Sequence, residues 1–312
     1  MAHTESRKVV IAAITGNLLI AVVKFIAAAL TGSSAMISEG IHSLVDTGNG
    51  GLLLHGMSEA RKPADRAHPF GYGMALYFWT LVVSVSIFGI GGGVSLYEGV
   101  SHIRHIAPEV VTSNPAPNYI VLGIAAVIEG WSFSIAVREF RRLKGNMGAW
   151  RFIRRTKDPS TFAVVLEDTA ALLGLVFAFL GVFLGHLFKN PYLDGAASVA
   201  IGLLLISVAL VLAFETKSLL LGEGVDARTL ADIRKLVESE PLVEGTAEIL
   251  TMYIGPENLL LNLGVRFKKG ITAEQMHDAI HRIEKNIQGS YPQSMRVYIE
   301  AESLPVKEGR GN

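Results

Sequence analysis

The chain has 312 residues, of which 50% are hydrophobic and only 18% are charged, whereas an ordinary soluble protein carries roughly 25% charged residues. This composition predicts a membrane protein. The 28 Lys and Arg residues balance the 28 Asp and Glu residues, so no basic excess is present to bind nucleic acid, and we expect no such partner. The sequence contains no Cys, so any metal must bind to His, carboxylate, amide or backbone oxygen.

Six segments are apolar over about 20 residues, the length of helix that spans the hydrocarbon layer of a membrane. They cover approximately residues 8–30, 34–60, 73–103, 118–143, 161–188 and 192–219. The first is too long for the core of a signal peptide, so we expect it in the mature protein. The second is the least hydrophobic of the six.

The loops between these spans predict their orientation. The connection between the fourth and fifth spans is strongly basic, and basic loops stay in the cytoplasm. Its basic residues, with those of its flanks, are Arg138, Arg141, Arg142, Lys144, Arg151, Arg154, Arg155 and Lys157. Both termini are therefore expected in the cytoplasm. Because the N-terminus shows no Arg- and Ser-rich leader, we expect a bacterial inner (plasma) membrane.

Beyond the last span, polar and apolar residues alternate in a way that no membrane helix shows. Asp226 caps one predicted helix, and Thr272 with Gln275 forms a capping box for a second. Between them, a turn at Gly255-Pro256 joins two strands into a hairpin.

A third strand completes an αββαβ order. It directs either Val297 and Ile299 or Tyr298 and Glu300 toward the core, depending on its register.

The predicted organisation therefore has three parts. Residues 1–220 form a six-helix transmembrane domain, 221–305 a cytoplasmic α+β domain, and 306–312 a disordered tail.

Polar residues line one face of the second span. Glu39, His42, Asp46 and Asn49 are spaced 3, 4 and 3 residues apart, which stacks them along one side of a helix. A carboxylate buried in a membrane is costly unless a cation, a proton or a hydrogen-bond donor compensates its charge. A polar seam between helices would explain the same stripe, but we favour a cation site because ionisable residues are rare at this depth.

Carboxylates also interrupt two other spans. Glu167 and Asp168 are adjacent in the fifth span and point about 100° apart on a helix, so we expect one to coordinate an ion and the other to support it. Alternatively, Glu167 lies near the cytoplasmic water. Glu129 stands alone in the middle of the fourth span, where it must pair or carry a proton. Its isolation favours a proton carrier or a helix–helix contact over a metal ligand, and we assign no role to Glu98.

A weaker candidate lies in the connection between the second and third spans. Asp65 and His68 could hold a cation at the surface. Two ligands rarely bind a metal tightly, and a turn containing Pro and Gly explains the same residues without one.

The sequence resembles the cation diffusion facilitator family, zinc-type divalent cation/proton antiporters with six membrane helices and a ferredoxin-like cytoplasmic domain. The resemblance rests on three features: the motif Ser-Glu-Gly-Ile-His-Ser-Leu-Val-Asp over 38–46, the motif His-Pro-Phe-Gly-Tyr-Gly over 68–73, and the αββαβ order. The run Leu-Glu-Asp-Thr-Ala-Ala over 166–171 is similar to the zinc transporter 9-like branch.

This resemblance implies a metal site made of two residues from the second span and two from the fifth. His42, Asp46 and Asp168 match three of those positions, whereas the fourth falls on Val164, which cannot coordinate. The candidates to replace it are Glu167, Asn49, Glu129 and water. Zinc is the expected transported ion, and manganese, iron or cobalt would also suit such ligands. No resident cofactor is expected.

Accessory metal sites of the family are incomplete in this sequence. Tyr72 stands beside Asp65 and His68 where a second His often occurs. In the soluble domain, the expected ligand positions fall near Asn262, Glu300 and Glu302. Metal-dependent closure of the soluble domains is therefore not expected, although the resemblance implies a homodimer.

The expected mechanism is alternating access coupled to protons. Ligands must be deprotonated to hold a metal, so binding releases protons and reprotonation expels the ion. The alternative is a non-transporting membrane metal sensor or scaffold. We do not expect an enzyme, because the sequence has no His-Glu-x-x-His, Gly-x-Ser-x-Gly or phosphate-loop motif.

Overall fold

The computed structural model describes residues 2–105, 115–291 and 294–301. Glu302 and the expected tail over 306–312 lie outside the described residues. The chain divides into two compact units, one formed by residues 1–59 and 75–217 and the other by 60–74 and 218–312. The connection over 60–74 therefore belongs to the C-terminal unit. Its position in the sequence, between two predicted spans, does not suggest this.

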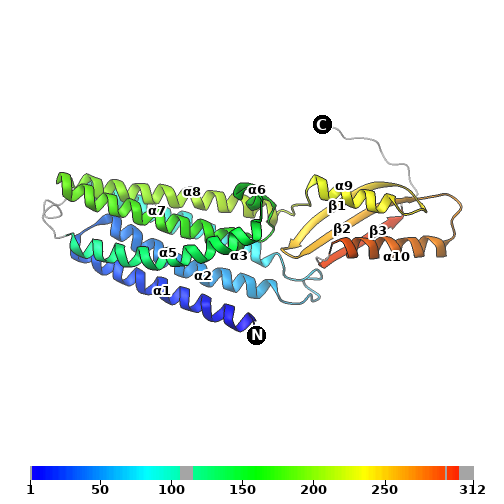
Figure 1. Cartoon of the computed structure of the whole chain (residues 1–312), viewed down its shortest axis with the longest axis horizontal. Helices are drawn as coiled ribbons and strands as arrows, with labels where there is room; N and C mark the ends of the chain where they lie inside the picture. The colour runs from blue at the N-terminus through cyan, green and yellow to red at the C-terminus, as the bar shows by residue number, and fades with distance from the viewer. Residues whose placement is uncertain (1, 106–114, 292–293, 302–312) are drawn as a thin grey trace. The chain divides into compact units, whose positions relative to one another are not determined.

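The first unit is a bundle of long helices whose axes run roughly along one direction (Figure 1). They are α1 (Ala2–Thr31), α2 (Ser34–Ala60), α5 (Ala116–Lys144), α7 (Pro159–Phe188) and α8 (Tyr192–Leu220), together with a broken helix made of α3 (Ala75–Ser86), η1 (Ile87–Gly93) and α4 (Val94–Arg104). A short helix, α6 (Ala149–Arg155), lies in the basic connection and was not expected from the sequence.

Among the described residues, five helices are long and apolar enough to cross a membrane. These five correspond to the first, third, fourth, fifth and sixth predicted spans. The remaining one, α2, is continuous over the expected residues 34–60 but is too polar to be counted with the others. Its polar stripe must therefore be covered by neighbouring helices, because a lipid-facing helix would not tolerate it.

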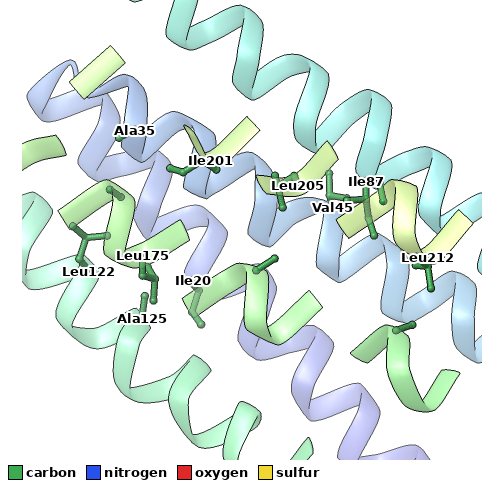
Figure 2. Packing of buried hydrophobic residues seen from close by; sticks show 14 of the residues in the cluster. Ile20, Ala35, Val45, Ile87, Leu122, Ala125, Leu175, Ile201, Leu205 and Leu212 are labelled. Carbon is green, nitrogen blue, oxygen red and sulfur yellow. The ribbon is translucent and has the colours of Figure 1, made fainter. Parts of the chain in front are cut away.

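The core of the bundle is built from small and branched side chains on neighbouring helices (Figure 2). Ala35 on α2, Ala125 on α5 and Ile201 on α8 are each at most 1% exposed. Many large apolar residues on the outer faces of the same helices are exposed, among them Val127 and Phe214. A bundle that is apolar on its outside as well as in its core is suited to a lipid environment.

Glycines bring the third span and α8 into close contact. A Cβ atom on Gly202 would lie 3.0 Å from the carbonyl oxygen of Gly92, and one on Gly195 would lie 3.1 Å from the carbonyl oxygen of Gly99. Gly92 belongs to η1, a π-helical segment with three consecutive glycines, and π segments often occur at functional sites in helices. Small residues allow two membrane helices to approach at backbone distance.

The second unit contains the predicted αββαβ order. Its elements are α9 (Ala227–Glu238), β1 (Val243–Gly255), β2 (Asn258–Phe267), α10 (Ala273–Ser290) and β3 (Ser294–Ala301). The strands form one sheet in the order β1-β2-β3, with β1 antiparallel and β3 parallel to β2. Both predicted helix caps are present, the Asp226 side chain at α9 and the Thr272–Gln275 capping box at α10.

The sheet buries one face against both helices. Leu261 and Leu263 on β2 are fully buried, together with Ile233 on α9 and Ile283 on α10. In β3, Val297 and Ile299 pack against this core, whereas Tyr298 is 50% exposed. The structure thus selects the first of the two registers that the sequence left open.

The glycine contacts generate a stability prediction. Gly202→Leu should lower the melting temperature of the detergent-purified protein strongly, because overpacking a tight contact costs about 1–3 kcal/mol or more. Gly123→Leu is the matched control, since a Cβ atom on Gly123 meets nothing within 4 Å. Equal melting temperatures for the two variants would show that the close approach is not needed.

Candidate metal and proton site

The polar stripe of α2 lies inside the bundle. Glu39 is 0% exposed, and His42 and Asn49 are each 2% exposed. The side chain of Asp46 is 14% exposed. The helical spacing that predicted a common face is thus realised, and that face is turned away from lipid.

His42 and Asp46 form the centre of the stripe. Nδ1 of His42 lies 3.4 Å from Oδ1 of Asp46, one helical turn away. Nε2 of His42 and Oδ1 of Asp46 are both buried and have no hydrogen-bond partner. Buried polar atoms normally have a hydrogen-bond partner, so His42 Nε2 and Asp46 Oδ1 are two donor atoms that a cation could bind.

The carboxylates of α7 face two different helices. Asn49 Nδ2 on α2 donates a hydrogen bond of 3.0 Å to Oε1 of Glu167, and Ser132 Oγ on α5 donates one of 3.3 Å to Oδ2 of Asp168. Asp46 lies three residues before Asn49 on α2 and therefore shares the face that meets Glu167. The second and fifth predicted spans therefore bring their ionisable groups into one region.

These groups do not form a complete coordination shell. Within the part of the chain that the structure describes, no three His, Asp or Glu side chains are arranged to hold a metal ion. Val164, at the position of the expected fourth ligand, is 38% exposed and has no donor atom. The site of His42, Asp46 and Asp168, completed by Glu167, Asn49, Glu129 or water, therefore stays a prediction.

Lys24 on α1 is a residue that the sequence reasoning missed. Its side chain is fully buried, and Nζ donates to Oε2 of Glu39 at 2.7 Å, to Oγ of Ser43 at 2.9 Å and to Oε1 of Glu129 at 2.9 Å. Glu129 thus pairs across helices, one of the two roles expected for it. A Lys in the middle of an apolar span is as unusual as a carboxylate, so the same rule applied to basic residues would have found it.

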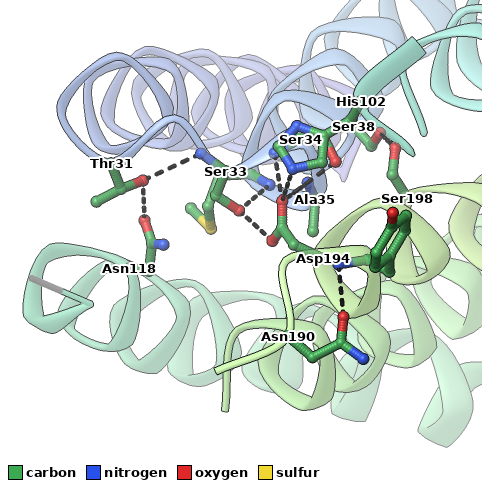
Figure 3. Close-up of polar contacts among 12 residues, drawn as sticks. Thr31, Ser33, Ser34, Ala35, Ser38, His102, Asn118, Asn190, Asp194 and Ser198 are labelled. Atoms are coloured by element: carbon green, nitrogen blue, oxygen red, sulfur yellow. Dashed lines mark hydrogen bonds and ion pairs between the residues drawn. The ribbon is translucent and has the colours of Figure 1, made fainter. Parts of the chain in front are cut away.

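The start of α2 is held by Asp194 of α8, which the sequence reasoning also missed (Figure 3). Oδ2 of Asp194 accepts hydrogen bonds from the backbone N–H groups of Ser34 at 2.6 Å and Ala35 at 3.3 Å, and Oδ1 accepts one of 2.6 Å from the Ser33 hydroxyl. The first N–H groups of a helix have no partner within it. A carboxylate at that end satisfies them and interacts favourably with the helix dipole.

The predicted surface site in the 60–74 connection is a hydrogen-bonded turn. Oδ1 of Asp65 accepts from the His68 backbone N–H and Oδ2 accepts from the Tyr72 hydroxyl, each at 2.7 Å. These two hydrogen bonds hold the pKa of Asp65 below its usual value, and the bond from Tyr72 has the larger effect. His68 Nδ1 lies 3.7 Å from Asp65. The turn accounts for both residues, and cation binding there stays a prediction.

The accessory positions of the soluble domain face solvent. Asn262 on β2 and Glu300 on β3 are both exposed. They lie on neighbouring strands but are not opposite each other, since Asn262 pairs with Tyr298 and Glu300 pairs with Gly264. The expectation that they support no metal-dependent closure stays a prediction, and Glu302 lies outside the described residues.

Two family models match nearly the whole chain. The cation efflux transmembrane domain matches residues 10–221, and the cytoplasmic domain of cation efflux proteins matches residues 225–304. The chain belongs to the cation efflux family, the cation diffusion facilitators. It is accordingly a multi-pass membrane protein with a C-terminal α+β domain.

Named relatives support the same placement. The chain is 36% identical over 251 residues to the mitochondrial proton-coupled zinc antiporter SLC30A9 of Homo sapiens, which covers 80% of this chain but only 44% of that protein. It is 29% identical to metal tolerance protein C4 of Arabidopsis thaliana, over 84% of this chain and 57% of that one. An uncharacterized transporter of Methanocaldococcus jannaschii is 25% identical over 96% of this chain and 98% of its own. This chain thus spans less than half the length of the human relative.

The capping contact at Asp194 gives a prediction about the start of α2. Asp194→Ala should destabilise the purified protein by at least about 2 kcal/mol, because it removes a helix cap and leaves buried donors unpaired. Asp194→Asn keeps one acceptor and should fall between Asp194→Ala and wild type in thermal unfolding. If Asp194→Ala melts with wild type, the carboxylate does not hold α2.

Proposed function

We propose that this chain exports a divalent metal cation, zinc in the first place, across a membrane in exchange for protons. The observation that carries this proposal is that two buried atoms, His42 Nε2 and Asp46 Oδ1, have no hydrogen-bond partner on the helix that Asn49 joins to Glu167. A dication would compensate the carboxylates and supply the missing partner. The names of the relatives, two of which refer to zinc or metal, support the same substrate class.

Exchange follows from the chemistry of the ligands. Imidazole and carboxylate bind a metal only when deprotonated, so metal entry releases protons and protons arriving from the far side displace the metal. Alternating access would expose the α2–α7 region first to one side and then to the other. Exporting one net charge against 100 mV, inside negative, costs about 2.3 kcal/mol, so exchange for two protons is electrically neutral and exchange for one is not.

Orientation and assembly belong to the same proposal. The basic residues around α6 support a cytoplasmic position for the connection between α5 and α7, which would put the C-terminal domain and both termini on that side. We further propose a homodimer, supported by the match to a cytoplasmic domain of cation efflux proteins. A bacterial inner membrane stays a prediction.

A second candidate is a membrane metal sensor or scaffold that does not transport. The observation that favours it is the lack of three assembled ligands among the described residues, together with the apolar Val164. Transport of metal across a bilayer separates the two functions.

The flux experiment uses purified protein in liposomes that contain a zinc-sensitive dye, with an imposed pH gradient. Wild type should move zinc, and His42→Ala or Asp168→Ala should reduce the rate at least about tenfold, since each removes one of few ligands. Glu98→Gln, outside the proposed site, is the control. Normal zinc flux in Asp168→Ala would exclude the site, and no flux in wild type would favour the sensor. Repeating the assay with manganese, iron and cobalt, each with a dye that responds to that metal, shows which ions the protein moves.

A second test adds a ligand at Val164 instead of removing one. Val164→Asp should place a carboxylate one turn before Asp168 and raise zinc affinity about tenfold or more, because it supplies a fourth ligand. Val164→Ala provides the matched control without a donor. Isothermal titration of the two purified variants with zinc measures the difference, and equal affinities would contradict the assumed ligand geometry.

A further inference from the structure

Three oxygen-bearing side chains surround the ammonium of Lys24, and we call them the oxygen cage: Glu39 and Ser43 from α2 and Glu129 from α5. All three lie within 2.7–2.9 Å of Lys24 Nζ. The side chains of Lys24 and Glu39 are 0% exposed and that of Glu129 is 10% exposed. The cage is therefore closed off from bulk water and from lipid.

The cage offers more oxygen atoms than the ammonium can satisfy. An ammonium has three N–H donors, and all three are used by the three cage side chains. Glu39 Oε1 and Glu129 Oε2 remain buried with no hydrogen-bond partner. Glu39 Oε1 occupies the space left by Gly174 of α7, where a Cβ atom would overlap it. Two carboxylates and a hydroxyl are the oxygen ligands that Mg²⁺, Ca²⁺ or Mn²⁺ prefer.

The cage is also adjacent to the proposed metal site. Glu39 precedes His42 by three residues and Ser43 follows it directly. Because Lys24 Nζ bonds to Glu39 and Ser43, its positive charge lies close to His42. With Lys24 in place the cage carries a net charge of −1, and without Lys24 the net charge would be −2, which one dication would neutralise.

We propose that the oxygen cage is a second cation site that Lys24 keeps permanently filled. The tethered ammonium excludes a second dication, so that one dication is carried per cycle. Its charge also weakens binding at the neighbouring site enough for the metal to be released. The second effect rests on the proposed function, whereas the occupancy of the cage does not.

A purely structural ion pair makes a different prediction. If Lys24, Glu39 and Glu129 only join α1, α2 and α5, removing Lys24 lowers stability and leaves the number of bound cations unchanged. If the cage is a cation site, removing Lys24 adds one bound dication per protomer. Metal stoichiometry therefore distinguishes the two roles, which stability alone does not.

The first experiment titrates the purified full chain with Mn²⁺, using electron paramagnetic resonance to count the bound ions. Lys24→Met should bind one Mn²⁺ more per protomer than wild type, whereas Lys24→Arg should not. The triple variant Lys24→Met/Glu39→Gln/Glu129→Gln removes all three charges together and should lose the extra ion. An unchanged count in monodisperse Lys24→Met overturns the proposal.

The second experiment does not require that Lys24→Met folds. Glu39→Gln/Glu129→Gln leaves the ammonium uncompensated, so Zn²⁺ affinity at the neighbouring site should fall about tenfold or more, because like charges repel strongly at low dielectric. Unchanged Zn²⁺ affinity overturns the proposed effect of Lys24 on the neighbouring site, and the Mn²⁺ count decides the occupancy of the cage. Wild type that binds no Zn²⁺ at all would instead defeat the proposed function, and an extra Mn²⁺ in Lys24→Met would still be measurable.

Discussion

The structure of the membrane unit depends on one constraint, the free energy required to hold a charge away from water. An isolated ionised side chain in an apolar interior costs several kcal/mol or more, and a charge that remains there needs a counter-charge and hydrogen bonds. The bundle meets this requirement for Lys24, Glu39 and Glu129 within one group. For Glu167 and Asp168 the compensation is different, because each carboxylate accepts one hydrogen bond from a neighbouring helix.

The same constraint explains the position of α2. This helix carries ionisable side chains that lipid would not tolerate, so α1, α5, α7 and α8 must cover it. Asp194 of α8 holds its first turn, Lys24 of α1 holds its middle, and Asn49 bonds it to Glu167 of α7. Among the buried atoms of α2 that have no hydrogen-bond partner are Glu39 Oε1, His42 Nε2 and Asp46 Oδ1. All three lie on the polar stripe, which is where we place the transported ion.

The oxygen cage extends this argument to a charge already present in the chain. Lys24 neutralises part of a carboxylate group that would otherwise attract a second dication beside the first. A transporter must bind its ion firmly enough to select it and loosely enough to release it. A covalently attached cation near the site shifts that balance toward release without competing for the same ligands.

Local patterns were sufficient for most of the fold. Apolar length located the long helices to within a few residues, and side-chain caps at Asp226 and Thr272 located the helices of the soluble domain, because caps and periodicity depend on residues close in sequence. The short α6 and the π segment η1 were not anticipated. The register of β3 was left open for a related reason, since both faces of that strand carry an apolar residue and only packing against α10 and β2 distinguishes them.

In the candidate site, too, local spacing could be read from the sequence and contacts between helices could not. The spacing of Glu39, His42, Asp46 and Asn49 within one helix could be read directly, because residues three and four apart share a face. The partner that each of them meets could not be read, because the partners lie on other helices up to 118 residues away, as for Asn49 and Glu167. Sequence therefore sufficed to identify the ionisable groups of α2 and α7, while the pairing of Glu39 and Glu129 with Lys24 depended on helix packing, which alone decides which buried charges are neighbours.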